Sequence, residues 1–561
     1  MRRAAETRRE QPVRPRALSR TTSMLSHPSP HPAPQSPAAG AVSLTDRPSG
    51  TRRSLLLKAC LFATGLSGIV AEFVLSTLAT YLLGNAILQW TLVMSLMLFA
   101  MGAGTRVSRA LHRHLLDCFI AVEFLLSLLC AVSSVSIYTL AAFTESLNLF
   151  IYALAIAIGL LIGMEIPLVA RINETYETLR TNIAGVLEQD YYGALAGGLL
   201  FAFVALPRLG LTYTPLALGA LNFSVAATLF LRCRGSLRRP RLLGAGLIAC
   251  TAILAGLALT VEPIILYGQQ SRYRDKIIHA EQTPYQNIVL TQFRDTYWLF
   301  LDGSLQFSSF DEARYHEPLV HPAMQLSRDR RRVLILGGGD GLAAREALKY
   351  AEVEELVLVD LDPGVTKLGR THPALRRLNA NAFDSPRLRV INMDGALYVR
   401  DEPGLFDVVI IDLPDPKSVA LARLFSLEFY QLLRRRLAPG GVLVTQSTSP
   451  AMAPSVFQSI GKTLRAAGFS VLPYHTSVPS MGDWGWHLAT APDAASEALL
   501  RRRFAALTYA GITTRYLTAE LSAAMLAFGK EPPGSADEVE INTELRPVLP
   551  TYYRAGRWGL L

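Results

Sequence analysis

Four aspartates are the residues of this 561-residue chain best placed to do chemistry, because each stands where a short apolar run ends. They are Asp340, Asp360, Asp394 and Asp412, after the runs VLILGGG, VEELVLV, LRVINM and FDVVII. In an open α/β sheet, ligands bind in the crevice outside the carboxyl ends of the strands. We therefore expect the four carboxylates to converge on one pocket. Asp360 has the position that hydrogen-bonds ribose hydroxyls in nucleoside-binding sheets.

The glycine run 337–341 (GGGDG) indicates which nucleoside fits this pocket. It is not a G-x-G-x-x-G loop, and Asp340 lies within it. A carboxylate a few ångströms from a pyrophosphate repels it by on the order of a few kcal/mol, so NAD, FAD and ATP fit poorly. A cationic nucleoside, such as a sulfonium compound derived from adenosylmethionine, fits well. Asp340 has a second interpretation as the cap of the next helix, but that leaves the other three acids unexplained.

A second acid follows the fourth strand in the segment Asp412-Leu413-Pro414-Asp415-Pro416. Two carboxylates three residues apart can face one pocket, where one accepts a proton from an ammonium and the other holds a second cation. Taken alone, an ordinary turn is an equally good interpretation, because Asp side chains bond the local backbone and Pro fixes φ. The upstream segment 301–321 adds His316 and further acids. It contains no H-x-x-x-H pair, so the sequence indicates no metal site.

The elements that must position these residues follow from the order of the apolar runs. Over residues 331–445, strand-like runs alternate with helical stretches, which is typical of a doubly wound parallel sheet. Residues 277–307 alternate in short β-like runs between polar turns and predict a small antiparallel sheet.

The first half of the chain predicts a multi-pass α-helical membrane domain, because apolar stretches of about 20 residues with few charges recur from 55 to 267. The predicted spans are 59–83, 87–105, 116–140, 148–170, 191–207, 212–231 and 242–261. Ten arginines lie in the second, fourth and sixth loops, and Arg208 alone lies in the first, third and fifth. The positive-inside rule therefore places the N-terminus in the cytoplasm.

Composition excludes several classes of function. Residues 1–53 are rich in Arg, Pro and Ser, lack apolar periodicity and are predicted to be disordered. They carry +7 of the net charge of +10, so the rest of the chain is nearly balanced and nucleic-acid binding is not indicated. All five cysteines precede residue 260, so a disulfide framework, a Cys-ligated zinc site and a cysteine nucleophile are not expected in the second half.

The motifs of the second half together resemble those of the spermidine synthases, or polyamine aminopropyltransferases. They are YQN (285–287), DGxxQ (302–306), DExxYHE (311–317), GGGDG (337–341), Asp360, DG (394–395), DxxDP (412–416) and TRYLTAELSAAMLAF (514–528). Their order and spacing agree over about 275–530, and the preceding spans make the chain resemble the membrane-fused bacterial branch of that family.

The resemblance implies a role for each matching residue. Gln286, Asp360, Asp394 and Gly395 would hold the adenosyl moiety of decarboxylated S-adenosylmethionine, and Asp340 its aminopropyl amine. His316, Asp340 and Asp415 would contact the amine substrate, and Asp412 would accept its proton. The expected reaction transfers the aminopropyl group to an amine, with putrescine expected as acceptor, and gives spermidine and methylthioadenosine. No cofactor and no metal are expected, because the sulfonium is already a good leaving group.

The sequence departs from the family at two places that affect the choice of amine. Soluble members have a Tyr-rich stretch where this chain reads HTSVPSMGDWGWH (475–487), so we expect Trp484 and Trp486 to replace it by cation–π contact. The segment after DxxDP reads KSVALARLFS, so the lid over the site is expected to differ.

Two other functions stay open from the sequence. A methyltransferase would share the glycine loop and Asp360 but would not need Asp415. A polyamine transporter with a nucleoside-binding sensor domain would use Glu72, Glu123 and Glu165, which lie inside apolar runs; carboxylates within a membrane are costly and are functional candidates. The bland interpretation is that these three glutamates bond Ser, Thr or Arg within the bundle.

The expected organisation is a tail (1–53), a membrane domain of six or seven spans (54–267), a β module (268–325), a methyltransferase-like Rossmann domain (326–530) and a C-terminal tail (531–561). The expected partners are small polyamines, the nucleoside and the lipid bilayer, and a homodimer or homotetramer stays open. The expected location is the inner membrane, with residues 268–561 in the cytoplasm. That placement requires that 242–261 return to the side it entered from or lie along the surface, or that two of the predicted spans form one element. The first is plausible because 242–261 is rich in Gly and Ala and ends at Glu262-Pro263. The alternative is an enzyme outside the cytoplasm, which would need exported substrate.

Overall fold

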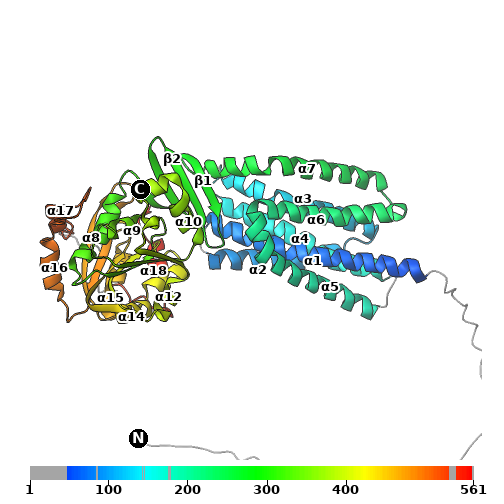
Figure 1. Ribbon diagram of the computed structural model, residues 1–561. Helices are drawn as coiled ribbons and strands as arrows, with labels where there is room; N and C mark the ends of the chain where they lie inside the picture. The colour runs from blue at the N-terminus through cyan, green and yellow to red at the C-terminus, as the bar shows by residue number, and fades with distance from the viewer. Residues whose placement is uncertain are drawn as a thin grey trace, which may run out of the picture. The chain divides into compact units, whose positions relative to one another are not determined.

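The structure is a computed structural model that describes residues 47–83, 86–141, 143–144, 146–174, 179–529 and 538–558 (Figure 1). Most of the tail predicted over 1–53 lies outside the described residues, and residues 47–53 belong to the first helix. Contacts divide the chain into residues 1–50 and residues 51–561, and the elements below belong to the second part except for the first four residues of the first helix.

Residues 47–270 form seven helical segments that lie alongside one another (Figure 1). They are α1 (Arg47–Leu83), α2 (Ala86–Ser108), α3 (Leu115–Ala141), α4 (Leu147–Asn173), α5 (Leu179–Leu200) with the π-helix η1 (Phe201–Leu209), α6 (Gly210–Cys233) with the 3₁₀ turn η2 (Arg234–Ser236), and α7 (Pro240–Gln270). Six described stretches are long and apolar enough to cross a membrane, judged by length and composition. The fifth, Asn182–Ser236, has 55 residues and covers two predicted spans. Gly210, with φ +62°, separates them.

The helices alternate in direction, as close contacts along their lengths show. In α3 and α6, Ser127 donates to the carbonyl of Gly219 at 2.7 Å and Ser134 to that of Leu211 at 2.6 Å, so these two helices are antiparallel. A Cβ at Gly65 or Gly193 would overlap backbone of the facing helix, α5 or α1. Such small residues let helices approach closely, as is common in membrane bundles.

Helix α7 differs from the prediction that 242–261 is a shortened, non-crossing stretch. It is a 31-residue helix that continues through Pro263 and runs beside α3, with Gly246 against Phe124 and Gly268 against Tyr138. One proline removes a single backbone hydrogen bond, and the packing against α3 compensates for this loss. By length and composition, α7 is a candidate span like the others.

The predicted antiparallel module is confirmed as a four-stranded sheet in the order β1-β2-β3-β4. Its strands are Lys276–Gln282, Asn287–Phe293, Thr296–Leu301 and Ser304–Ser308. Asp302 and Gly303 both have positive φ in the β3–β4 turn, which is the conformation that a two-residue hairpin needs.

The larger sheet has seven strands in the order β10-β11-β9-β8-β5-β6-β7 (Figure 1). Strands β5 (Arg332–Gly337), β6 (Glu355–Asp360), β7 (Leu388–Asn392), β8 (Phe406–Asp412) and β9 (Leu437–Gln446) are parallel, and β10 (Ser470–Val478) and β11 (Gly482–Thr490) add an antiparallel hairpin. The chain order reverses between β5 and β8, so the ligand crevice of a doubly wound sheet is expected beyond the ends of these two strands.

Helices cover both faces of this sheet, because the central strands bury residues on alternate sides. Val333 and Ile335 pack towards α8 (Ala313–Leu326), α9 (Leu342–Ala347) and α16 (Glu497–Ala505). Leu334 and Leu336 pack towards α12 (Gly395–Asp401), α14 (Leu427–Arg436) and α15 (Pro454–Ala466). The remaining helices are α10 (Pro363–Thr371), α11 (Pro373–Leu378), α13 (Val419–Ala422), α17 (Ala519–Ala524) and α18 (Leu549–Arg554), with 3₁₀ turns at Ala382–Asp384 and Arg423–Phe425.

The described part of the predicted C-terminal tail is folded onto this domain, which differs from the prediction. Asn542 is buried, and its side chain donates to the carbonyl oxygens of Ala422 and Phe425 at 2.7 and 3.1 Å. Ser459 of α15 donates to the carbonyl of Glu540 at 2.7 Å. These residues are polar and lack periodicity, so the sequence carries no signal for their packing.

Candidate active site

The glycine loop and Asp412 meet at the point where β5 and β8 lie side by side. Gly338 donates its backbone N–H to the carbonyl of Asp412 at 3.1 Å. A Cβ on Gly337, whose φ is +84°, would lie 2.0 Å from that same carbonyl oxygen. Only glycine permits this approach, so the loop residues and the acid of β8 are held together by backbone geometry.

Asp412 is the acid at the end of β8. Tyr315 of α8 donates its hydroxyl to Oδ1 of Asp412 at 2.8 Å. Burial raises the pKa of Asp412 to about 6, and the charge of Asp340 adds to this rise, while His316 and the Tyr315 hydrogen bond oppose it. A carboxylate with a raised pKa accepts a proton from an ammonium more readily than an ordinary aspartate does.

His316 is held beside this pair by its own helix. Its Nδ1 lies 2.9 Å from the carbonyl oxygen and 3.2 Å from the carboxylate of Glu312. Glu312 in turn forms ion pairs with Arg345 and Arg515. Burial lowers the pKa of His316, which favours a neutral imidazole. Because Nδ1 faces Glu312, Nε2 is the ring nitrogen left for a ligand.

Asp340 fits both interpretations that the sequence left open. Its Oδ1 accepts the backbone N–H of Leu342, the first residue of α9, at 2.8 Å, while the N-cap position itself is Gly341. Its charge also acts on Asp412, His316 and Asp360. One carboxylate oxygen of Asp340 therefore holds the backbone, while the charge of the carboxylate acts on the neighbouring titratable groups.

Asp360 and Gln286 are organised by an acid that the sequence analysis missed, Asp362. Asp360 accepts the backbone N–H groups of Gly339 at 3.0 Å and of Asp362 at 2.9 Å. Burial raises the pKa of Asp360 to about 6. The side chain of Asp362 accepts from Gln286 Nε2 at 3.0 Å and from Thr283 Oγ1 at 2.7 Å, which ties the β module to the sheet.

Asp394 and Gly395 are less open to a ligand than the resemblance implies. Oδ1 of Asp394 accepts the backbone N–H groups of Ala396 and Leu397 and caps α12. Its other oxygen is paired with Arg423. A Cβ at Gly395 would make only an ordinary contact of 3.6 Å with Leu336, so nothing in the ligand-free structure requires glycine there.

Asp415 lies at the other end of the site and is joined to the late segment of the chain. Tyr553 of α18 donates its hydroxyl to Asp415 Oδ2 at 3.0 Å, and Gln446 Nε2 lies 3.4 Å from Oδ1. Lys417 donates to Ser304 Oγ at 2.6 Å and stands 5.4 Å from the ring centre of Tyr553. Burial raises the pKa of Asp415 and lowers that of Lys417.

The two tryptophans expected to enclose the amine have different positions. Trp486 is 0% exposed, stacks on Tyr474 at a ring distance of 5.6 Å and lies 5.7 Å from the ring of Tyr315, so it is packed in the core and its contact with an amine stays a prediction. Trp484 lies 6.3 Å from the ring of Tyr315 and stays slightly exposed. These two residues lie on one face of β11, and their spacing does not distinguish them.

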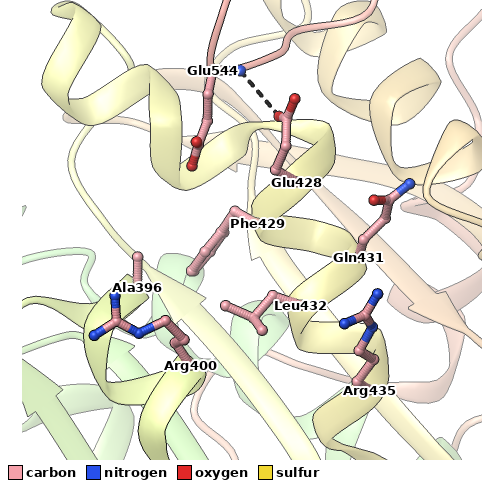
Figure 2. A pocket seen from close by; sticks show the side chains of 8 residues that line it. All are labelled: Ala396, Arg400, Glu428, Phe429, Gln431, Leu432, Arg435 and Glu544. Atoms are coloured by element: carbon pink, nitrogen blue, oxygen red, sulfur yellow. Dashed lines mark hydrogen bonds between the residues drawn. The ribbon is translucent and has the colours of Figure 1, made fainter.

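A surface hollow of about 260 Å³ is separate from these groups. It lies over α12 and α14, with Arg400 and Arg435 on its rim and Glu428 accepting the backbone N–H of Glu544 (Figure 2). None of the predicted site residues lines it. Within the described ranges, no group of three or more His, Cys, Asp or Glu side chains has a metal-binding arrangement.

Comparison with known proteins identifies the family. Residues 312–499 match the model of the spermine/spermidine synthase domain. The chain is 42% identical over 501 residues to polyamine aminopropyltransferase 2 of Aquifex aeolicus, covering 89% of this chain and 98% of that protein. The chain belongs to the polyamine aminopropyltransferase family.

Further relatives agree with this assignment. Polyamine aminopropyltransferase 2 of Ralstonia nicotianae is 40% identical over 519 residues, covering 91% of this chain and 99% of that protein. Among solved structures, spermidine synthase from Thermotoga maritima is 28% identical, with a TM-score of 0.40, and covers 45% of this chain and 85% of its own. A spermidine synthase in complex with the transition-state analogue AdoDATO is 29% identical, with a TM-score of 0.41. The match covers 45% of this chain and 86% of that one. The similarity to the two curated relatives covers 89% and 91% of this chain, so it includes the helical part.

Proposed function

We propose that this aminopropyltransferase transfers the aminopropyl group of decarboxylated S-adenosylmethionine to putrescine, giving spermidine and methylthioadenosine. The observation that carries the proposal is the buried group formed by Asp412, Tyr315, His316 and Asp340 at the junction of β5 and β8. It combines a carboxylate able to accept a proton with further negative charge, and both substrates are cations.

The transfer step assigns the proton to Asp412. The acceptor amine attacks the aminopropyl carbon next to the sulfonium, a C–N bond forms, and the C–S pair returns to sulfur as methylthioadenosine leaves. An amine is protonated at neutral pH, so it must lose a proton before or during attack. The pKa of Asp412, raised to about 6 by burial, reduces the difference from an ammonium donor.

The nucleoside is proposed to lie across the ends of β5, β6 and β7. Asp360 binds the ribose hydroxyls, and Gln286 contacts the adenosyl moiety from its anchor on Asp362. Asp394 and Gly395 complete this side, which requires the pairing between Asp394 and Arg423 to change when the nucleoside binds. No cofactor takes part, because the sulfonium supplies the leaving group.

The acceptor amine is proposed to lie between Asp412 and Asp415. Asp340 and His316 hold the aminopropyl and acceptor amines near Asp412, and Asp415 binds the distal ammonium. Tyr553 and Gln446 orient Asp415. Lys417 lies next to Asp415 and offsets part of its charge, so acceptor choice depends on this pair.

A direct assay separates this proposal from methyl transfer on the same kind of sheet. Purified full-length protein is incubated with putrescine and either decarboxylated S-adenosylmethionine or S-adenosylmethionine, and the nucleoside products are separated. We expect consumption of the decarboxylated compound alone, with one spermidine per methylthioadenosine. Consumption of S-adenosylmethionine with release of S-adenosylhomocysteine would overturn the proposal, and turnover only with a different amine would overturn the choice of acceptor.

We also propose that the helical part is a multi-pass membrane domain. The arginine-rich ends of α2, α4 and α6 lie at one end of an alternating bundle, as the positive-inside rule requires. Helix α7 runs beside α3 along its length, so by the alternation it ends on the side opposite these arginines. We therefore place the catalytic part, which follows α7, on that side and not on the cytoplasmic side expected from the sequence.

A further inference from the structure

Two glutamates inside the helical bundle have no role in the reaction and almost no partners. Glu123 of α3 and Glu165 of α4 are 0% and 2% exposed. Both carboxylate oxygens of Glu123 and Oε1 of Glu165 have no hydrogen-bond partner. No Lys, Arg or His of the described residues forms an ion pair with either one. This rules out, for the part of the chain described, the Arg pairing that the sequence left open.

The two carboxyl groups belong to one polar layer to which five helices contribute, α1, α3, α4, α5 and α6. They interact electrostatically with each other, and Thr64 of α1, whose hydroxyl donates to the carbonyl of Leu61 at 3.1 Å, lies beside Glu165. Ser67 donates to Oδ1 of Asn222 of α6 at 2.6 Å, and the Asn222 amide nitrogen has no partner. Asp190 of α5 adds a third acid close to Glu165.

This layer lacks a positive charge. Buried carboxylates without a counter-ion are strongly unfavourable, and in membrane proteins they mark ion or substrate pathways. Glu123 and Glu165 share this layer but do not hydrogen-bond each other, so three of their four carboxylate oxygens have no hydrogen-bond partner. A bound cation would satisfy all three unpaired oxygens at once.

The arrangement fits an ammonium group better than a metal ion. Within the described residues no metal-binding group of three or more side chains exists, whereas a primary ammonium has three N–H donors for three unpaired oxygens. A narrow apolar cavity of about 60 Å³ lies at the end of the bundle where α1 begins, lined by Leu56, Leu57, Leu116, Ile172, Leu229, Cys233 and Ser236. Leu57 precedes Thr64 by two turns, about 10 Å of helix, and Cys60 between them interacts with both glutamates.

We propose that Glu123 and Glu165 form a cation-binding site inside the helical bundle, whose ligand is the terminal ammonium group of a linear aliphatic amine. This site is separate from the catalytic carboxylates and does not depend on the reaction that they perform. It gives the helical domain an amine-binding function of its own.

The test counts amine sites in the full-length protein in detergent, with radiolabelled 1,4-diaminobutane as the probe. We expect two sites per chain in the wild type, and one in Glu123→Gln and in Glu165→Gln with kcat unchanged within twofold. Glu72→Gln is the matched control, because it removes a carboxylate from α1 outside the pair, and it should retain both sites. A number of sites that is the same in both pair variants as in the wild type would overturn the proposal, whatever the catalytic site binds.

A second measurement uses only the wild type, in case a pair variant fails to fold. Dicyclohexylcarbodiimide modifies carboxyl groups in apolar surroundings, and the modified peptides are found by mass spectrometry. We expect Glu123 or Glu165 to be labelled and 1,4-diaminobutane to reduce this labelling at least fivefold, whereas sodium chloride at the same concentration should not. Labelling that is unchanged by the amine, or reduced equally by sodium, would refute the ammonium assignment.

Discussion

Replacing Tyr315 by Phe tests the proton-transfer role of Asp412 without touching the carboxylate itself. The Tyr315 hydroxyl donates to Oδ1 of Asp412 at 2.8 Å and favours the ionised form of that acid. Without this donor, the pKa of Asp412 should rise above its present value of about 6. The reaction needs the carboxylate, so the variant should lose activity at low pH and regain it as the pH rises.

The size of the shift follows from the strength of the lost bond. A hydrogen bond to a charged group contributes about 1.5–3 kcal/mol, and about 1.4 kcal/mol corresponds to one pKa unit. The pKa of Asp412 in Tyr315→Phe should therefore lie at about 7–8. At pH 7 this reduces the ionised fraction, and with it kcat/KM, by roughly two- to tenfold, with little loss at about pH 9.

The assay is the pH profile of kcat/KM for the wild type and the variant under identical conditions. The ionisation of the amine substrate is common to both and cancels in their ratio. Tyr398→Phe is a matched control, because Tyr398 donates to the carboxylate of Glu402 at 3.3 Å outside the site. Its profile should match the wild type.

The reasoning is refuted if Tyr315→Phe has the same acidic limb as the wild type. It is also refuted if kcat/KM of the variant is lower by the same factor at every pH. That result would mean a lost contact with substrate or a distorted site, and no change in the ionisation of Asp412.

Four further predictions address the remaining assignments. Asp412→Asn should lower kcat by about 10²–10⁴-fold, the scale of a general base, while methylthioadenosine affinity stays near wild type; the exposed Asp401→Asn is the control, and near-normal turnover would contradict the role. Asp360→Ala should weaken methylthioadenosine binding about tenfold or more in calorimetry, by loss of charge-assisted hydrogen bonds, and unchanged affinity would contradict the pocket. Tyr553→Phe should raise KM for putrescine several-fold with little change in nucleoside affinity, and an effect on the nucleoside alone would argue against an amine-side position. Alkaline phosphatase fused after residue 561 should be active in whole cells, because the catalytic part is proposed to lie outside the cytoplasm. Fluorescence from a fluorescent protein fused at the same position would instead place the catalytic part in the cytoplasm.

The sequence predicts much of the catalytic fold because its strands are buried on both faces and end in distinctive residues. The runs that became β5, β6, β7, β8 and β9 and the acids at their ends were all identified, since a parallel sheet forces such ends to one edge. Tyr315 was visible only as part of a motif, because nothing in its spacing shows that α8 directs it at Asp412, 97 residues later.

Other features depend on contacts that carry no sequence signal. Asp362 is both a helix cap and the partner of Gln286, and only the second role links it to the site. Tyr553 reaches Asp415 from a segment without periodicity. In the helical part, length and apolarity predicted the segments well, but Pro263 suggested an end to α7 that its packing overrides.

The link between Tyr553 and Asp415 has a consequence for the order in which the enzyme is made. All residues proposed to hold the nucleoside, from Gln286 to Gly395, are translated well before Tyr553, which follows Asp415 by 138 residues. A chain cut before α18 would thus retain the acids of the nucleoside side and lack the donor that orients the amine-binding acid.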